Sequence, residues 1–338
     1  MAPEQGPAQQ RIRVGILGCS DIARRRFLPA LLKTKNAVLS VVASRDLEKA
    51  KRFCPSAAYD IAGYDGLLAR DNVDLVYISL PNHLHEEWVM KALEQGKHVI
   101  CEKPLAPSSE AVKRMTGYAE VKGLLLYENI VYLHHPRHQA VKNMIAAGTI
   151  GVITELRTSF GFMLKDCGGF RMKTGQGGGA FLDQARYPLS AALFFLTGAA
   201  YRFDGRALFR NGLNVAMRVN ARTDCDEHFT FSIGFEQDYE CWYELVGERG
   251  TLRVDRAYTA PADLAGAIQL MTNGDVASAP VPAADHFALM LEKVCDLILR
   301  KQDYSGLCRD ARRLALLADQ AWESCERVNL GEMRNEQP

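Results

Sequence analysis

The sequence lacks any apolar run approaching the roughly 20 residues that a membrane-spanning helix requires. It also lacks an excess of either charge, because 41 lysines and arginines stand against 40 aspartates and glutamates, giving a net charge of +1. A chain without a strong positive charge has no general electrostatic attraction for nucleic acid or for an anionic membrane. We therefore predict neither nucleic acid nor a membrane as a partner.

Cysteines spaced as C-x-x-C are absent as well, and the nine cysteines are odd in number and scattered. This usage is typical of reduced thiols, so we predict a cytoplasmic protein. Residues 1–10 are polar and include two prolines, which predicts a disordered tail rather than a signal peptide. The sequence has no internal repeat or low-complexity segment, and its 338 residues suffice for two domains.

Strands and helices are expected to alternate over residues 11–130. The expected strands cover residues 11–18, 38–44, 74–79, 98–101 and 124–127, and the expected helices cover residues 21–33, 47–53, 64–70, 86–95 and 108–121. Because apolar strands alternate with helices, the pattern predicts an α/β domain with a doubly wound parallel sheet. Such a sheet binds ligands beyond the carboxyl ends of its strands.

A glycine turn follows the first strand and opens the first helix, which is the context of a dinucleotide-binding fingerprint. Gly18, Ser20 and Ala23 occupy the positions of G-x-G-x-x-A. The motif is imperfect, because serine stands where the second glycine normally lets the pyrophosphate approach the backbone. The predicted cofactor contacts at this turn are Gly18, Cys19, Ser20, Asp21 and Ile22.

The end of the second strand decides between the two nicotinamide cofactors. A carboxylate there binds the ribose 2′-hydroxyl of NAD, whereas an arginine accommodates the 2′-phosphate of NADP. Ser44 and Arg45 stand at this point, and the following Asp46 can cap the helix at 47–53 instead of binding ribose. The sequence therefore favours NADPH bound by Ser44 and Arg45, with a solvated arginine as the alternative.

Two more turns follow strands of the predicted sheet. They are Leu80-Pro-Asn-His-Leu-His85 and Glu102-Lys-Pro104. Pro104 cannot continue the hydrogen bonding of a strand, so the chain leaves the sheet at Lys103, where open α/β sheets bind their ligands. The predicted cofactor contacts at these turns are Leu80, Pro81, Asn82, His85, Glu102 and Lys103. The alternatives are a plain charged turn and, for His85, a structural histidine.

Three histidines in five residues, at His134, His135 and His138, raise the question of a metal site. Pro136 lies between them, and no cysteine, aspartate or glutamate is adjacent. The segment is better explained as a helix that begins at Pro136 and ends at Ala147. We therefore predict no metal.

The pattern changes to alternating apolar and polar residues after Val152. The expected strands cover residues 152–160, 201–210, 214–223, 227–235, 239–246 and 251–254, and the last helices cover residues 284–300 and 307–327. Alternation predicts a mainly antiparallel sheet with one buried face. We expect a substrate-binding and oligomerisation domain at 131–300, followed at 301–338 by a helix that packs back toward the first domain. We expect the other face of the sheet to be apolar and uncovered, which predicts a homodimer or homotetramer formed through that face.

A run of three glycines precedes a helix that is expected to reach Leu196. Glycines at Gly177 to Gly179 allow unusual backbone angles or the close approach of another group. Asp183 and Tyr187 are four residues apart and therefore share a helix face. A carboxylate and a phenol on one mostly apolar helix indicate a candidate catalytic pair, although a loop and a structural tyrosine are an open alternative.

The sequence thus contains four motifs. They are the turn at 15–23, Pro81-Asn-His-Leu-His85, Glu102-Lys-Pro104 and the segment from Gly177 to Tyr187. Together they resemble the glucose-fructose oxidoreductase / inositol dehydrogenase / MocA (Gfo/Idh/MocA) family over nearly the whole chain. The resemblance implies an N-terminal Rossmann domain and a C-terminal α+β domain with a large open sheet used for oligomer contacts. It also implies that Lys103 is the catalytic lysine near the nicotinamide and that Asp183 matches the family's aspartate.

The family's commonest residue at position 187 is histidine, whereas this chain has Tyr187. In this respect the chain is similar to the sugar-nucleotide 3-ketoreductases of deoxysugar biosynthesis, which use lysine and tyrosine with NADPH. The resemblance implies reduction of a ring ketone, at C-3, of a nucleotide-linked sugar whose nucleotide is dTDP. Two alternatives stay open: an NAD(P)-dependent dehydrogenase that oxidises a free sugar or inositol, and a non-catalytic protein that senses dinucleotide.

The resemblance also implies roles for individual residues. Tyr187 would give a proton to the ketone oxygen, and Lys103 would polarise that oxygen and lower the pKa of the tyrosine. Asp183 would hold the lysine in its charged form. Arg171 would contact the cofactor or a substrate phosphate, unless it is a surface arginine. The family pattern further predicts that the Lys103–Pro104 peptide bond is cis.

Overall fold

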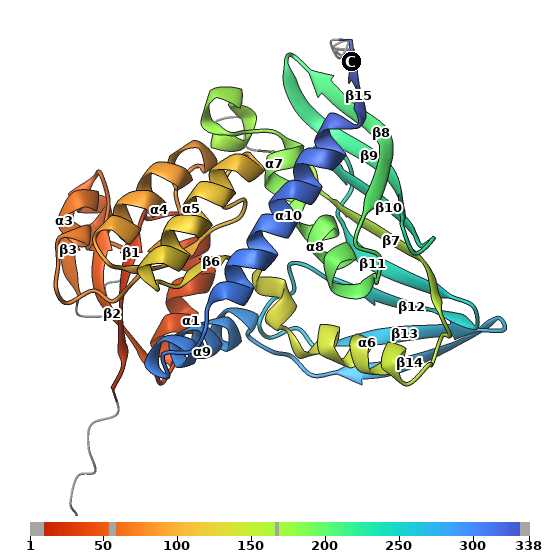
Figure 1. Ribbon diagram of the computed structural model, residues 1–338, viewed down its shortest axis with the longest axis horizontal. Helices are drawn as coiled ribbons and strands as arrows, with labels where there is room; N and C mark the ends of the chain where they lie inside the picture. The colour runs from red at the N-terminus through yellow and green to blue at the C-terminus, as the bar shows by residue number, and fades with distance from the viewer. Residues whose placement is uncertain (1–9, 54–58, 166–168, 332–338) are drawn as a thin grey trace, which may run out of the picture.

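A computed structural model describes residues 10–53, 59–165 and 169–331 (Figure 1). The predicted N-terminal tail lies outside these residues except for its last position. None of the described helices is long and apolar enough to cross a membrane. The seven cysteines among the described residues are all free.

The first domain is built on a parallel sheet of six strands in the order β3-β2-β1-β4-β5-β6. The strands are β1 (Ile12–Leu17), β2 (Ala37–Ala43), β3 (Asp60–Ala62), β4 (Leu75–Ile78), β5 (His98–Cys101) and β6 (Leu126–Glu128). The predicted doubly wound parallel sheet is confirmed. The short edge strand β3 was not predicted, because its three residues carry no strand pattern. The reversal of strand order places β1 beside β4, where such sheets bind dinucleotides.

Helices connect these strands. They are α1 (Leu28–Lys33), α2 (Leu47–Lys51), α3 (Tyr64–Leu68), α4 (His85–Glu94) and α5 (Ser109–Lys122). The predicted helix at 21–33 contains a π-helical turn, η1 (Ala23–Phe27), and Phe27 stacks on Tyr77 with ring centroids 3.6 Å apart. Ser108 caps α5 by accepting a hydrogen bond from the backbone N–H of Ala111, which fixes where that helix begins.

The second domain holds a sheet of nine strands in the order β14-β13-β12-β11-β7-β10-β9-β8-β15. The strands are β7 (Ile153–Gly161), β8 (Tyr201–Arg210), β9 (Leu213–Thr223), β10 (His228–Gly234), β11 (Glu240–Gly247), β12 (Gly250–Asp255), β13 (Gly266–Thr272), β14 (Asp275–Val281) and β15 (Cys325–Asn329). The pairs β7–β10 and β8–β15 are parallel and the others are antiparallel. The predicted mainly antiparallel sheet is therefore confirmed.

The prediction missed β13, β14 and β15. A helix was expected to continue to residue 327, but α10 (Ser305–Glu323) ends earlier and the chain becomes a strand. The strand forms because β8 offers a free edge and a glycine there leaves room for a side chain. A Cβ atom placed on Gly205, the partner of Cys325, would lie 3.0 Å from the Cys325 Sγ. Such pairing depends on tertiary contacts that local sequence does not reveal.

Four helices cover one face of the second sheet, namely α6 (Pro136–Ala146), α7 (Ala180–Gln184), α8 (Arg186–Phe195) and α10 (Figure 1). The opposite face is polar. Arg157 lies between Thr230 and Glu244 on that face, and Arg253 binds Glu244 at 2.7 Å. The expectation of an apolar outward face is wrong, because its residues alternate with the apolar residues that point into the core.

The last two helices connect the domains. Residues 284–300 were assigned to the second domain, but α9 (His286–Leu299) packs its apolar side into the core under β1 and α1. Figure 1 shows α10 crossing between the two domains. One set of its buried residues packs into the core of the first domain, and the other set packs into the core of the second domain. The first set is Cys308, Ala311 and Ala315, and the second is Leu314, Leu317, Ala318 and Ala321.

Candidate active site

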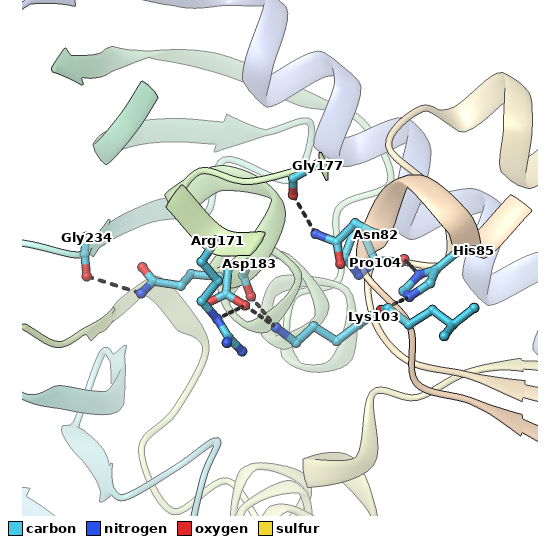
Figure 2. A network of polar contacts seen from close by, with 10 residues as sticks. Asn82, His85, Lys103, Pro104, Arg171, Gly177, Asp183 and Gly234 are labelled. Carbon is cyan, nitrogen blue, oxygen red and sulfur yellow. Dashed lines mark hydrogen bonds and ion pairs between the residues drawn. The ribbon is translucent and has the colours of Figure 1, made fainter. Parts of the chain in front are cut away.

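Lys103 leaves the end of β5 and meets Asp183 of α7 (Figure 2). Its Nζ donates a hydrogen bond to the backbone carbonyl of Asp183 and lies 3.3 Å from Oδ1 of the same residue. Arg171 Nε lies 3.0 Å from that Oδ1 atom. Burial raises the pKa of Asp183, but the charges of Lys103 and Arg171 outweigh burial and hold the pKa below its usual range. The Lys103–Pro104 bond is cis, as predicted.

Tyr187 lies close to Lys103. Ala185 separates α7 from α8, so Asp183 and Tyr187 stand on two short helices rather than on one. The Lys103 Nζ is 4.9 Å from the centroid of the Tyr187 ring, which also packs against Phe160 and Tyr258 at 4.8 and 5.3 Å. Lys103, Asp183 and Tyr187 therefore form one cluster.

The pKa of Tyr187 is raised far above its usual value. Burial is the main cause, and the negative charges of Asp183 and Glu102 add to it. The expectation that Lys103 would lower this pKa is therefore wrong. The Lys103 Nζ lies 4.9 Å from the centroid of the ring and is paired with Asp183, whose negative charge raises this pKa. The phenol remains protonated at neutral pH and can donate a proton.

Glu102 is tied to the sheet. Its Oε1 accepts hydrogen bonds from the Tyr77 hydroxyl at 2.6 Å and from the Asn129 side chain at 2.7 Å, and burial raises its pKa. Tyr77 and Asn129 could not be predicted from the sequence, because only their positions in the fold, on β4 and after β6, bring them to Glu102. They fix the turn that presents Lys103.

The glycine run joins the second domain to the first. Gly177 has a φ of 74°, and its carbonyl accepts a 2.8 Å hydrogen bond from the side chain of Asn82 (Figure 2). A Cβ atom on Gly177 would lie only 2.7 Å from the Cβ of Asn82. The close approach expected at these glycines is confirmed, and it is an approach between two segments of the chain.

His85 is fully buried, and each ring nitrogen lies against a backbone carbonyl. Nδ1 is 2.7 Å from the oxygen of Pro104, and Nε2 is 2.8 Å from the oxygen of Leu80. Both nitrogens are thus engaged within the protein. The assignment of His85 as a cofactor contact is corrected: the imidazole holds together the turns that follow β4 and β5.

The turn after β1 has the shape of a dinucleotide-binding loop. Gly18 has a φ of 104°, and a Cβ atom there would lie 2.8 Å from a methyl carbon of Leu80. Ser79 Oγ donates to the Gly18 carbonyl at 2.8 Å, and Ser20 Oγ accepts from the backbone N–H of Ala23 at 3.1 Å. The serine therefore caps the helix that follows. Cys19 is buried, whereas Asp21 and Ile22 are exposed at the first turn of the helix.

The end of β2 fits a cofactor with a 2′-phosphate. Asp46 Oδ1 accepts hydrogen bonds from the backbone N–H groups of Glu48 and Lys49, at 3.0 and 3.2 Å, and so caps α2 as predicted. Arg45 is exposed beside it, and Ser44 is buried. Because the carboxylate is used as a cap, the arginine is the charged group at this turn that suits a phosphate.

The three clustered histidines contact different partners. His134 Nε2 lies 2.9 Å from the Tyr127 hydroxyl, His135 Nδ1 accepts from the backbone N–H of Arg137, and His138 Nδ1 lies 2.9 Å from the Tyr243 hydroxyl. Within the described part of the chain, no three His, Cys, Asp or Glu residues are arranged to hold a metal ion. Pro136 opens α6 as predicted.

Comparison with known proteins gives a consistent result. Residues 12–130 match the model of an oxidoreductase family with an NAD-binding Rossmann fold, GFO/IDH/MocA, and residues 138–253 match the GFO/IDH/MocA C-terminal domain. Two relatives are named dTDP-3,4-didehydro-2,6-dideoxy-alpha-D-glucose 3-reductase. The one from Actinomadura kijaniata is 37% identical over 312 residues, 91% of this chain and 94% of the relative. The one from Saccharopolyspora spinosa is 38% identical over 277 residues, 81% and 83% of the two chains.

A solved structure is similar over nearly the whole chain. It is a 3-ketoreductase from Actinomadura kijaniata in complex with NADP and TDP-benzene. The TM-score is 0.92 at 34% sequence identity, and the match covers 95% of this chain and 100% of that one. The family models and the similar structure thus support the family that the motifs indicate. They also support the order of the two domains.

Proposed function

The chain belongs to the GFO/IDH/MocA oxidoreductase family, and we propose that it is an NADPH-dependent ketoreductase acting on a nucleotide-linked sugar. The proposed reaction is the reduction of the C-3 ketone of a dTDP-linked keto-deoxysugar. Relatives at 37% and 38% identity are named for this reduction. The observation in this chain that carries the proposal is the cluster of Lys103, Asp183 and Tyr187 beside the dinucleotide-binding turns.

The proposed roles follow from charge and position. NADPH, when bound, supplies the hydride. Tyr187 holds its proton at neutral pH, as an ordinary phenol does, and can deliver that proton to the oxygen of the reduced ketone. Lys103 places a positive charge near the forming alkoxide, and Asp183 orients the lysine through its carbonyl and carboxylate.

Cofactor choice can be tested at Arg45. We expect Arg45→Ala to weaken NADPH binding by roughly 10- to 100-fold, the effect of losing a charged hydrogen bond, and to change NADH binding little. Dissociation constants for both cofactors, measured by fluorescence titration, check the expectation. Arg52→Ala, which removes an exposed arginine at the end of α2, is the matched control. Equal losses for NADPH and NADH would show that Arg45 does not bind the 2′-phosphate.

We further propose that the protein is a homodimer or homotetramer formed through the outward face of the second sheet. The face combines an arginine and a tryptophan, since the Arg253 guanidinium lies 4.6 Å from the centroid of a Trp242 ring. Tryptophan and arginine are enriched at protein interfaces. Analytical ultracentrifugation at micromolar concentration is expected to give the mass of a dimer or tetramer, and Trp242→Glu to shift it toward a monomer. A stable wild-type monomer would contradict the proposal.

A cytoplasmic location is proposed as well. All cysteines in the described ranges are free thiols, and six of these seven are buried. Free thiols of this kind suit a reducing compartment.

The function itself is tested by NADPH consumption. The purified protein should oxidise NADPH when given the dTDP-linked 3-keto sugar, and product analysis should show a new hydroxyl at C-3. Free sugars and inositol with NADP test the alternative of a dehydrogenase. Turnover of free sugars but not of the nucleotide-linked ketone would favour that alternative, and no turnover with either would favour a dinucleotide-sensing protein.

A further inference from the structure

Two cations of the active site share one carboxylate. Lys103 and Arg171 both approach Asp183 Oδ1 (Figure 2), yet their exposure differs. The lysine side chain is 11% exposed, whereas the Arg171 side chain is 42% exposed. The lysine is therefore enclosed beside the tyrosine, and the arginine keeps much of its surface accessible to a ligand.

The contact with Asp183 uses only part of the arginine. It is made by Nε, at 3.0 Å from the carboxylate oxygen. A guanidinium has five N–H donors in a planar fork, so its terminal nitrogens can bind a second acceptor group. Two parallel hydrogen bonds from such a fork match a phosphate, and they form most readily where the arginine is already held in place.

The glycine run holds this arginine in place. The backbone carbonyl of Arg171 accepts a 2.8 Å hydrogen bond from the N–H of Gly179. A Cβ atom on Gly178 would lie 2.5 Å from the same carbonyl oxygen and 2.6 Å from that of Phe170. The turn that carries Arg171 is thus packed directly on the segment that leads into Asp183. The absence of a side chain at Gly178 is required for this packing.

Charge and distance indicate what the arginine binds. Lys103, Arg171 and Asp183 together carry a net positive charge, which favours an anionic ligand. Lys103 Nζ and Arg171 Nε lie 3.3 and 3.0 Å from the same oxygen atom, so groups bound to the two cations would be only a few ångströms apart. In a nucleotide-linked sugar, a ring ketone and the phosphate on the anomeric carbon belong to the same ring, so one molecule can present both groups to these two cations.

We infer that Arg171 binds the phosphate on the anomeric carbon of the substrate, and so distinguishes a nucleotide-linked sugar from a free one. This inference rests on the proposed function and adds a substrate-recognition residue to it. Asp183 then has two tasks, because it orients the catalytic lysine and the phosphate-binding arginine at once. The contact is with the substrate, whereas the sequence alone left open a contact with the cofactor, a contact with a substrate phosphate and a surface arginine.

The test compares two ligands that differ only in their phosphates. Thymidine diphosphate and thymidine are titrated into the NADP-bound protein by calorimetry. Arg171→Met should weaken thymidine diphosphate binding by roughly 10- to 100-fold, as expected for a lost charged hydrogen bond, and leave thymidine binding unchanged. Arg171→Lys, which keeps the charge but loses the fork, should recover part of the affinity. Lys173→Met, which removes an exposed cation two residues away, is the matched control.

The outcomes separate the inference from the proposed function. Wild-type affinity for thymidine diphosphate in Arg171→Met overturns the inference while the function stands. Loss of NADPH affinity in Arg171→Met, with thymidine diphosphate binding retained, also overturns it and assigns the arginine to the cofactor. A wild-type protein that reduces free keto sugars and binds no thymidine diphosphate contradicts the proposed function itself. Selective loss of thymidine diphosphate, with partial recovery in Arg171→Lys, supports the inference.

Discussion

Tyr187→Phe is expected to slow the chemical step by roughly 10²- to 10⁴-fold, the usual contribution of general acid catalysis. The substitution keeps the ring, which packs against Phe160 and Tyr258, and removes only the hydroxyl. Binding of the substrate and of NADPH should therefore change little. Single-turnover reduction, followed by the loss of NADPH absorbance, measures the effect directly.

A neighbouring tyrosine provides the control. The Tyr258 ring lies 5.3 Å from the Tyr187 ring, and its hydroxyl is hydrogen-bonded to Thr158. Tyr258→Phe also removes a buried hydroxyl and should retain most of the activity. If Tyr187→Phe turns over at nearly the wild-type single-turnover rate, Tyr187 is a packing residue. Lys103 then becomes the leading candidate for the proton donor.

The pH dependence follows from the direction of the pKa shift. Burial raises the pKa of Tyr187 above its usual value of roughly 10. A proton donor works only while it is protonated, and a raised pKa means that the proton is lost only at still higher pH. Deprotonation of Tyr187 should therefore cause no fall in the wild-type rate between pH 7 and about pH 10.

Lys103→Ala is expected to slow the reduction by roughly 10²- to 10³-fold, the effect of removing a positioned donor from a forming oxyanion. The variant also frees the carboxylate of Asp183 from one of its two cations. Lys97→Ala is the matched control, because Lys97 precedes β5 and binds the backbone carbonyl of Arg70 away from the site. A Lys103→Ala rate close to that of Lys97→Ala would remove the lysine from the mechanism.

The double variant tests whether the two groups act together. If Lys103 and Tyr187 serve the same oxygen in one transition state, the losses should not multiply. The double variant should be only slightly slower than the slower single variant. Fully multiplicative losses would indicate two independent roles.

The positions of Lys103, Asp183 and Tyr187 could be predicted, because they depend on local sequence and on the rule that parallel sheets bind ligands at the carboxyl ends of their strands. Lys103 follows an apolar strand and precedes a proline, and parallel strands bring such ends to one edge of the sheet. The four-residue spacing of Asp183 and Tyr187 places them near each other in a helix, even though the structure divides that helix at Ala185. The family resemblance then linked these two groups of residues.

Other features depend on distant contacts and could not be predicted. The ring of His85 is aimed at the carbonyls of Leu80 and Pro104, which only the folded turns bring together. The pKa of Tyr187 moves opposite to the expectation, because burial and the negative charges of Asp183 and Glu102 raise it. The strands β13 and β14 lack a strict alternation of buried and exposed residues, since most of their side chains are partly or fully exposed.

The course of α9 and α10 constrains how this protein can be recombined with its relatives. A chimera joined near residue 130 would keep the nucleotide-binding turns but take α9 from the other parent, although α9 fills the core beneath β1 and α1. The helix α10 would likewise have to match both parents, because its two sides are buried in different cores. Exchange of substrate specificity by shuffling should therefore succeed with an internal insert that ends before His286, leaving both terminal helices with the nucleotide-binding parent.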